Sequence, residues 1–288
     1  MAGFFGLFDF TKEGKGVSKN ERKKYRFFTF FEVYFRKFWK LMQLNFLFST
    51  SFLIPLSVIY VVNLVMTNKQ TPVYFFIILG IVIVSIIPIG SALTGLFYVS
   101  RNLAREEHSF IWTDFIKAVK GNWKTGSLIL FLDVIFAGAI YVGFTTYSAM
   151  EGILGTLGVA VITFVAVTIT FMNYYMFTMQ VTFKLTFKQL CKNGFLFAYL
   201  GMFKNILITI LLAAIIFAVY ILRPFSTIFV LSVVISLCAF IISFITYPTI
   251  KKFMIDPLYN KEEETQDTPQ IEEEKEIKPA FSDERKIK

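Results

Sequence analysis

The chain has 288 residues, of which 56% are hydrophobic and only 17% are charged, and its formal net charge is +9. Soluble domains contain about 45–50% apolar residues, so this composition excludes an ordinary soluble domain and predicts a protein embedded in a bilayer. The positive charge does not predict a nucleic-acid partner, because the basic residues gather at the ends of apolar runs, as the positive-inside rule for membrane proteins describes.

The N-terminal segment, residues 1–43, contains an amphipathic helix ahead of the first apolar run. At 100° per residue, one arc holds the basic residues Arg22, Arg26, Arg36, Lys37 and Lys40. The aromatic side chains between Phe27 and Trp39 fall on the opposite arc, with Val33 out of place. We expect this helix to lie along the membrane surface, where anionic inner-leaflet lipid attracts each Lys or Arg by about 1 kcal/mol. A docking face for a partner helix is the alternative.

Six stretches within residues 44–259 are apolar enough to cross about 30 Å of hydrocarbon, which requires about 20 helical residues. They cover residues 44–66, 74–98, 127–150, 153–178, 206–222 and 225–247. No cleavable signal peptide is expected, because the first long apolar run begins too late in the chain. The predicted fold is all-α, a polytopic six-helix transmembrane bundle.

The connections between these stretches differ in charge. Of the 29 Lys and Arg residues, 27 lie in residues 1–43, in the two long connections 99–126 and 179–205, or after the last span. The three short connections hold the other two, Lys69 and Arg223. Since Lys and Arg accumulate on the cytoplasmic side, we expect a multi-pass membrane protein with both termini in the cytoplasm.

The second span contains Pro88, which removes one backbone hydrogen bond and predicts a kink. The small residues that follow, Gly90 to Gly95, predict close packing against a neighbouring helix. A flexible helix that lines a substrate path is the functional alternative.

Seven polar or aromatic residues just after the second span form a candidate surface for a partner or ligand: Arg101, Arg105, Glu106, Glu107, His108, Trp112 and Asp114. The ordinary interpretation is a turn ordered by salt bridges among the Arg and Glu side chains. His108 is the only histidine, and neither a metal-ligand set nor a nucleophile accompanies it. Loops at the edge of a rigid scaffold often carry binding sites, so the surface stays a candidate.

The two long connections contain similar segments, which start at Asp114 and Thr186. Each begins with a residue typical of a helix N-cap and approaches a Gly or Asn-Gly stop, at Gly121 and at Asn193-Gly194. We therefore expect a short cytoplasmic helix before the third span and another before the fifth. Duplication or convergence explains their similarity.

Asp133 is the only acidic residue well inside a predicted span. A charge at mid-membrane costs at least about 2.5 kcal/mol on insertion scales, so we expect Asp133 to face the bundle interior or to be protonated. A basic residue near the inner boundary, an Asn or Tyr on another helix, or water is its expected partner.

The last segment, residues 260–288, contains ten acidic residues, six basic residues and one aromatic residue. Such a composition cannot bury enough apolar surface to offset the entropy of ordering, so a disordered acidic tail is predicted. The two cysteines, Cys191 and Cys238, are expected to be free and unreactive. The chain lacks common nucleotide, metal and catalytic motifs, so we expect neither a cofactor nor an enzyme.

Residues 88–95, 101–102, 105–115 and 121–124, together with the basic aromatic leader 27–41, resemble the YesL-like family of small bacterial membrane proteins. The resemblance reaches to about residue 259 and implies a helical membrane protein of Gram-positive type bacteria. It also implies a place beside carbohydrate uptake or degradation systems, and it supplies no catalytic residues.

Two hypotheses for function follow. The first is an accessory or scaffold membrane protein that contacts a partner such as a carbohydrate permease, because most unusual residues lie at the predicted cytoplasmic surface. The second is a small secondary transporter that uses Asp133 and the Pro88 helix, since transporters often contain broken helices and repeats.

Overall fold

The computed structural model describes residues 25–66 and 71–257, without the side chain of Ile54. The predictions for the first residues, for the acidic tail and for part of the first short connection therefore lie outside the described residues. The described chain is helical: α1 Arg26–Val65, α2 Pro72–Ala104, α3 Ile111–Ser148, α4 Ile153–Gln180, α5 Phe187–Leu200, α6 Met202–Ile221, α7 Ser226–Phe229, η1 Val230–Val234, α8 Ile235–Ile250 and η2 Lys251–Ile255.

Six helical stretches of the described chain are long and apolar enough to cross a membrane: α1, α2, α3, α4, α6, and the run of α7, η1, α8 and η2 from Ser226 to Ile255. Each of the six predicted spans falls almost wholly within one of them. Their lengths and apolar surfaces identify a multi-pass membrane protein with an all-α fold, as predicted.

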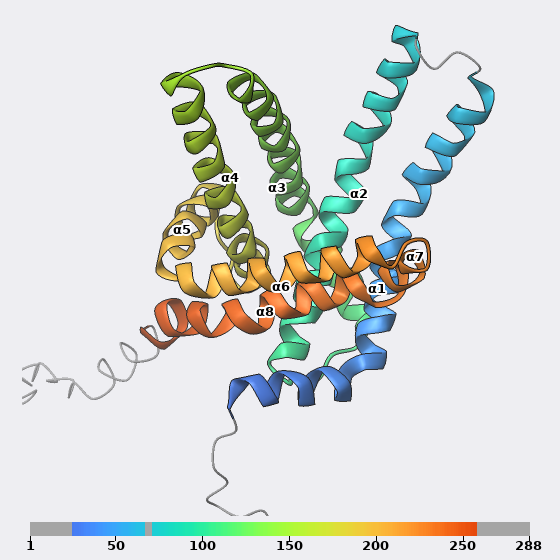
Figure 1. The fold of residues 1–288 in the computed structure, drawn as a ribbon. Coiled ribbons are helices and arrows are strands. Elements are labelled where there is room, and N and C mark those ends of the chain that lie inside the picture. The colour runs from blue at the N-terminus through green and yellow to red at the C-terminus, as the bar shows by residue number, and fades with distance from the viewer. Residues whose placement is uncertain (1–24, 67–70, 258–288) are drawn as a thin grey trace, which may run out of the picture.

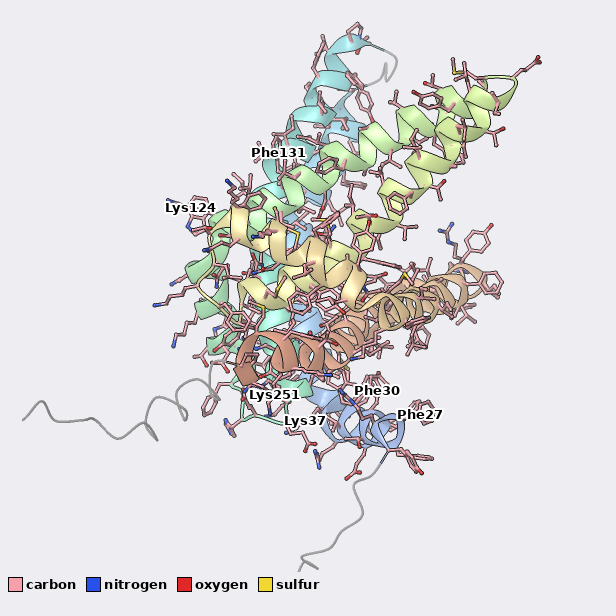
Figure 2. All side chains as sticks on the ribbon, turned by 90° about the vertical axis from the view of Figure 1, so that its left-hand side faces the viewer. Phe27, Phe30, Lys37, Lys124, Phe131 and Lys251 are labelled. Carbon is pink, nitrogen blue, oxygen red and sulfur yellow. The ribbon has the colours of Figure 1, made fainter. Side chains whose placement is uncertain are left out.

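The helices form three hairpins. α6–α8 runs across the molecule so that η1 lies beside α1, whereas α1–α2 and α3–α4 rise from a common end (Figure 1). We call this end the base. It contains the start of α1, the end of α2, the start of α3, α5 and the end of α8. Nitrogen atoms of basic side chains gather toward this end, as the labelled Lys37 and Lys251 illustrate, whereas the hairpin tips are mostly carbon (Figure 2).

The tight connection between α3 and α4 depends on one glycine. Gly152 has a φ of +85° and ends the turn just before α4 begins at Ile153. A side chain at this position would be strained, because L-residues rarely adopt positive φ. Gly152 therefore permits the short hairpin that was predicted between the third and fourth spans.

The predicted amphipathic helix and the first span form one continuous helix, α1. Its first turns run across the base, and the rest rises into the α1–α2 hairpin (Figure 1). Val33, the residue out of place in the amphipathic pattern, is only 1% exposed and belongs to the core. Val33 departs from the amphipathic pattern because this face of α1 packs on the rest of the protein.

The structure corrects one predicted boundary and extends another. α3 begins at Ile111 and continues through Gly121, so no separate short helix precedes the third span. Gly121 has open space around its Cα and no positive φ, so it lacks the geometry that ends helices. α5 does exist and has Thr186 as its N-cap, but it runs past Asn193-Gly194 to Leu200, and Gly194 packs beside Met176.

The predicted small-residue surface packs α2 against α3. A Cβ added at Gly90 would lie 2.6 Å from the Cα of Ser127 and 2.7 Å from the carbonyl oxygen of Gly126. Ser127 donates a hydrogen bond to the carbonyl of Ile87 at 3.1 Å, and Thr94 donates one to the carbonyl of Ala118 at 3.3 Å. The small residues therefore serve close helix packing.

A buried asparagine joins α1 to the last span. The Nδ2 of Asn45 donates to the carbonyls of Val230 (3.0 Å) and Leu231 (2.7 Å), and its Oδ1 accepts from the backbone N–H of Ser236 (2.8 Å). These partners lie in or beside η1, a π-helical turn, where regular i→i+4 bonding is interrupted. Asn45 thus supplies polar partners that lipid cannot provide.

Candidate functional site at the base

The turn between α2 and α3 lies at the base and contains most of the predicted site residues. Glu106 has a φ of 60°, a left-handed conformation that is rare for a residue with a side chain. The backbone N–H of Glu107 donates to the carbonyl of Asn102 at 2.9 Å, which closes the turn. Such local strain persists only where surrounding contacts enforce it.

Contacts with α1 and α3 hold this turn. The guanidinium of Arg36 forms an ion pair with the carboxylate of Glu106, and the Nζ of Lys40 donates to the carbonyl of Ser109 at 3.3 Å. Asp114 accepts hydrogen bonds from the hydroxyl of Ser109 (2.8 Å) and the backbone N–H of Phe110 (2.9 Å). Asp114 therefore lies in the first turn of α3, where Phe110 is the N-cap, and not at the expected N-cap position; it holds the chain just before the helix, which is a structural role.

Aromatic side chains project from this held turn. Phe110 is 68% exposed and Trp112 is 64% exposed. The imidazole of His108 packs edge-on against the ring of Phe110, with 4.6 Å between their centroids. The turn therefore displays an exposed patch, His108, Phe110 and Trp112, on a fixed backbone.

The predicted salt bridges are only partly present. Arg105 pairs with Glu107 at 2.6 Å, but Glu106 pairs with Arg36 of α1. The guanidinium of Arg101 is buried and donates to the carbonyl of Val181 (2.5 Å) and the hydroxyl of Thr182 (3.0 Å). Arg101 thus links the end of α2 to the end of α4 rather than joining the cluster of acids.

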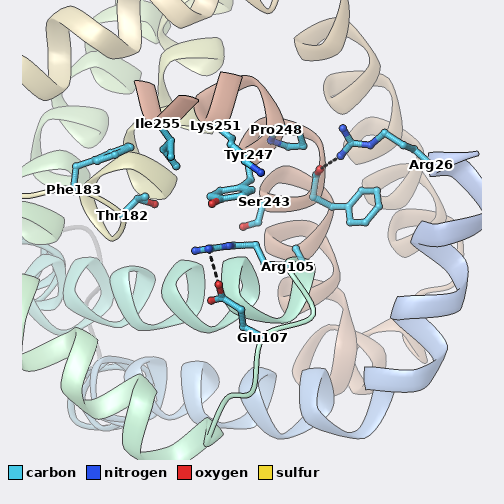
Figure 3. Close-up of a pocket in the computed structure, with 12 residues that line it drawn as sticks. Arg26, Arg105, Glu107, Thr182, Phe183, Ser243, Tyr247, Pro248, Lys251 and Ile255 are labelled. Atoms are coloured by element: carbon cyan, nitrogen blue, oxygen red, sulfur yellow. Dashed lines mark hydrogen bonds and ion pairs between the residues drawn. The ribbon is translucent and has the colours of Figure 1, made fainter. Parts of the chain in front are cut away.

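A pocket of about 800 Å³ opens beside the turn, where the ends of α2, α4 and α8 meet the start of α1. The guanidinium of Arg105 stacks over the ring of Tyr247, 4.7 Å from its centroid. Ser243, Tyr247 and Lys251 extend from the last helical run toward the same space, and Arg26 enters from α1 (Figure 3). The lining thus carries three cations, Arg26, Arg105 and Lys251, and one acid, Glu107.

Asp133 lies away from this pocket, between α3 and α4. Its Oδ1 accepts a hydrogen bond from the Nδ2 of Asn173 at 2.8 Å, so an asparagine on another helix is its partner, one of those expected. Cavities of about 370 Å³ and 480 Å³ adjoin this pair. Their linings are mainly apolar and do not include Pro88, which is exposed on α2. The structure does not bring these two candidates together.

Residues 64–144 match a family model described as "Protein of unknown function, DUF624". This is the YesL-like family. The resemblance inferred from the sequence is confirmed over this segment, which runs from the end of α1 through α2 and the turn into most of α3. No curated protein and no solved structure matches the chain.

The DUF624 segment contains every site residue that was predicted from the sequence, including Asp133 and Pro88. Nine pocket residues lie outside it. They include Arg26, Ser243, Tyr247 and Lys251, whose role sequence reasoning missed. A signal was present, because Ser243, Tyr247 and Lys251 are four residues apart and so share one helix face. The apolar character of the last span concealed it.

Neither a metal cluster nor a disulfide marks a site. Within residues 25–66 and 71–257, no group of three or more His, Cys, Asp or Glu side chains is placed to hold a metal ion. Cys191 and Cys238 are free, as predicted. Partial burial raises the pKa of the Cys191 thiol, which lowers its thiolate fraction and hence its reactivity at neutral pH.

Proposed function

We propose that this protein is an accessory membrane protein that binds a partner protein through the α2–α3 turn. The observation that carries the proposal is the display of Phe110 and Trp112, both more than 60% exposed, on a turn held by Arg36, Lys40 and Asp114. Exposed aromatic residues on a rigid backbone can bind without a large loss of conformational entropy. A carbohydrate permease is the partner class that the family resemblance suggests.

The proposal places the base, with both termini, in the cytoplasm of a bacterial cell. The distribution of charge supports this orientation, because 27 of the 29 Lys and Arg residues lie in the terminal segments and the two long connections. The partner surface would then face the cytoplasmic side of a permease or a soluble protein that docks on it.

The first turns of α1 would rest on anionic lipid of the inner leaflet. Their exposed side chains include Phe28 (62%), Phe31 (42%), Phe35 (69%) and Trp39 (70%), which follow one another at helical spacing of three or four residues. Phe30 and Tyr34, on the other side, contact the ring of Phe240 instead. The outward aromatic stripe supports lipid contact.

Photo-crosslinking in living cells tests the partner proposal. A photoreactive amino acid at Trp112 should capture a protein, whereas the same group at Leu154, which is 70% exposed at the tip of the α3–α4 hairpin, should not capture it. Trp112→Ala should reduce recovery of the complex by roughly 30-fold, because a central Trp contributes about 2 kcal/mol or more to an interface. Adducts with lipid alone, or equal capture from both positions, would contradict the proposal.

A small secondary transporter is the second candidate, and the Asp133–Asn173 hydrogen bond favours it. This polar pair lies between two helices and lines two cavities, and polar pairs within a membrane often mark transport paths. This candidate predicts that proteoliposomes containing the protein take up a solute. It also predicts that Asp133→Asn abolishes this uptake. Uptake that is equal in the variant would remove its support.

A further inference from the structure

We propose that the basic pocket at the base binds the phosphate group of a small anionic molecule. Three cations line it from three different elements: Arg26 from α1, Arg105 from the end of α2 and Lys251 from η2. The one acid in the lining, Glu107, is already paired with Arg105 at 2.6 Å. The pocket therefore presents a positive field to an incoming ligand. This inference is independent of the proposed partner surface.

Further cations surround the lining. The Nζ of Lys204 donates to the hydroxyl of Thr249 at 2.8 Å, one residue beyond the pocket residue Pro248. Buried Arg101 donates to the hydroxyl of Thr182, another lining residue. The contact of Arg101 directs positive charge at the pocket wall, which adds to the attraction for an anion.

Ser243 supplies a second, independent sign of a ligand. Its side chain is buried (0% exposed), it lines the pocket, and its hydroxyl has no hydrogen-bond partner among the described residues. Ser85 and Ser236 donate to a carbonyl in the same helical run. The hydroxyl of Ser100 in α2 also has no partner among the described residues, but Ser100 does not line the pocket. A buried hydroxyl without a partner is unfavourable, and an anionic oxygen in the pocket would accept its proton.

The arrangement fits a phosphate ester better than a carboxylate. A carboxylate has two oxygen atoms in one plane, whereas a phosphate monoester offers three terminal oxygens to donors in several directions. The described contacts of Arg26 include one hydrogen bond, from Nη2 to the carbonyl of Phe244 at 3.0 Å. A guanidinium carries five N–H donors, which is more than this one bond uses.

The size of the pocket requires more than a phosphate ion. A volume of about 800 Å³ lies within the range of about 300–1,000 Å³ that is typical of sites for small organic ligands. Phe183, Phe244 and Tyr247 provide aromatic surface for the organic part. Either the headgroup of an anionic phospholipid or a soluble phosphate ester has this chemistry.

Binding measurements on the full chain in nanodiscs test the proposal and separate the two sources. Glycerol 1-phosphate is titrated against protein in phosphatidylcholine nanodiscs, and retention of phosphatidylglycerol is measured separately by native mass spectrometry. Arg105→Gln with Lys251→Gln should weaken binding of the soluble ester, or retention of the lipid, by at least about tenfold, because charge-assisted hydrogen bonds are lost. Lys117→Gln with Lys120→Gln removes the same charge from exposed positions of α3 and should change neither.

Ser243→Ala distinguishes loss of binding from loss of fold. Removing a buried hydroxyl that has no partner should leave the thermal transition unchanged or raise it, while anion affinity falls by about fivefold, as for one hydrogen bond. Absence of both soluble-ester binding and selective lipid retention would overturn the proposal, as would equal losses in the Lys117/Lys120 control.

Discussion

Replacing Asn45 with leucine is expected to destabilise the folded protein by about 3 kcal/mol, because three backbone groups lose their partner at roughly 1 kcal/mol each. These groups are the carbonyls of Val230 and Leu231 and the N–H of Ser236. They lie at the π-helical turn of the last span, where neither water nor lipid can replace Asn45. Equilibrium unfolding of the purified protein in mixed micelles measures the change.

Asn63→Leu is the matched control for this prediction. Asn63 also lies in α1, but it donates to the carbonyl of Ile59 in its own helix and accepts one hydrogen bond from Tyr74 near the hairpin tip. Its replacement should cost less than about 1 kcal/mol, because both contacts are only partly buried and neither satisfies a backbone group of another helix. A stability of the Asn45→Leu variant equal to that of Asn63→Leu would show that the π-helical turn does not depend on Asn45.

Replacing Gly90 with leucine should cost about 3 kcal/mol, at the upper end of the usual range for overpacking. The new Cβ would meet the Cα of Ser127 and the carbonyl oxygen of Gly126, which are backbone atoms that cannot move aside. α2 and α3 share the most extensive contact of the described helix pairs, so their separation would also disturb the turn at the base. Thermal unfolding, with monodispersity on gel filtration, measures the loss.

Gly80→Leu provides the control in the same helix. A Cβ at Gly80 would meet no atom within 4 Å, and leucine has a higher helix propensity than glycine by almost 1 kcal/mol. This variant should therefore be as stable as the wild-type protein, or slightly more stable. Equal destabilisation by both substitutions would mean that the effect at Gly90 comes from the side chain in lipid rather than from helix packing.

The spans could be predicted from the sequence because a bilayer imposes one simple requirement, a helix of about 20 apolar residues. The prediction of a helix break before the third span was wrong for a local reason. Glycine often ends a helix, but Gly121 lies within α3. The helix before it is anchored in the core by Phe115, and the helix after it is anchored by Ile129. Tertiary packing outweighed the local preference.

The site was predictable only in part. The turn residues Arg105 to Asp114 are polar and aromatic in an apolar chain, so their composition alone drew attention to them. The pocket required knowledge of which helices meet, because Arg26 and Tyr247 are far apart in the sequence and come together only when α1 crosses the last span. Asn45 gave no sequence signal, since its role depends on a π-helical turn near residue 230.

The central claim is that the α2–α3 turn and the pocket face the cytoplasm. A thiol-labelling measurement in intact cells tests it, with Cys191 and Cys238 replaced by alanine and single cysteines placed at Trp112 or Glu151, both of which are exposed. A membrane-impermeant maleimide should label Glu151→Cys in intact cells and Trp112→Cys only after the membrane is permeabilised. Labelling of Trp112→Cys, but not Glu151→Cys, in intact cells would contradict the account.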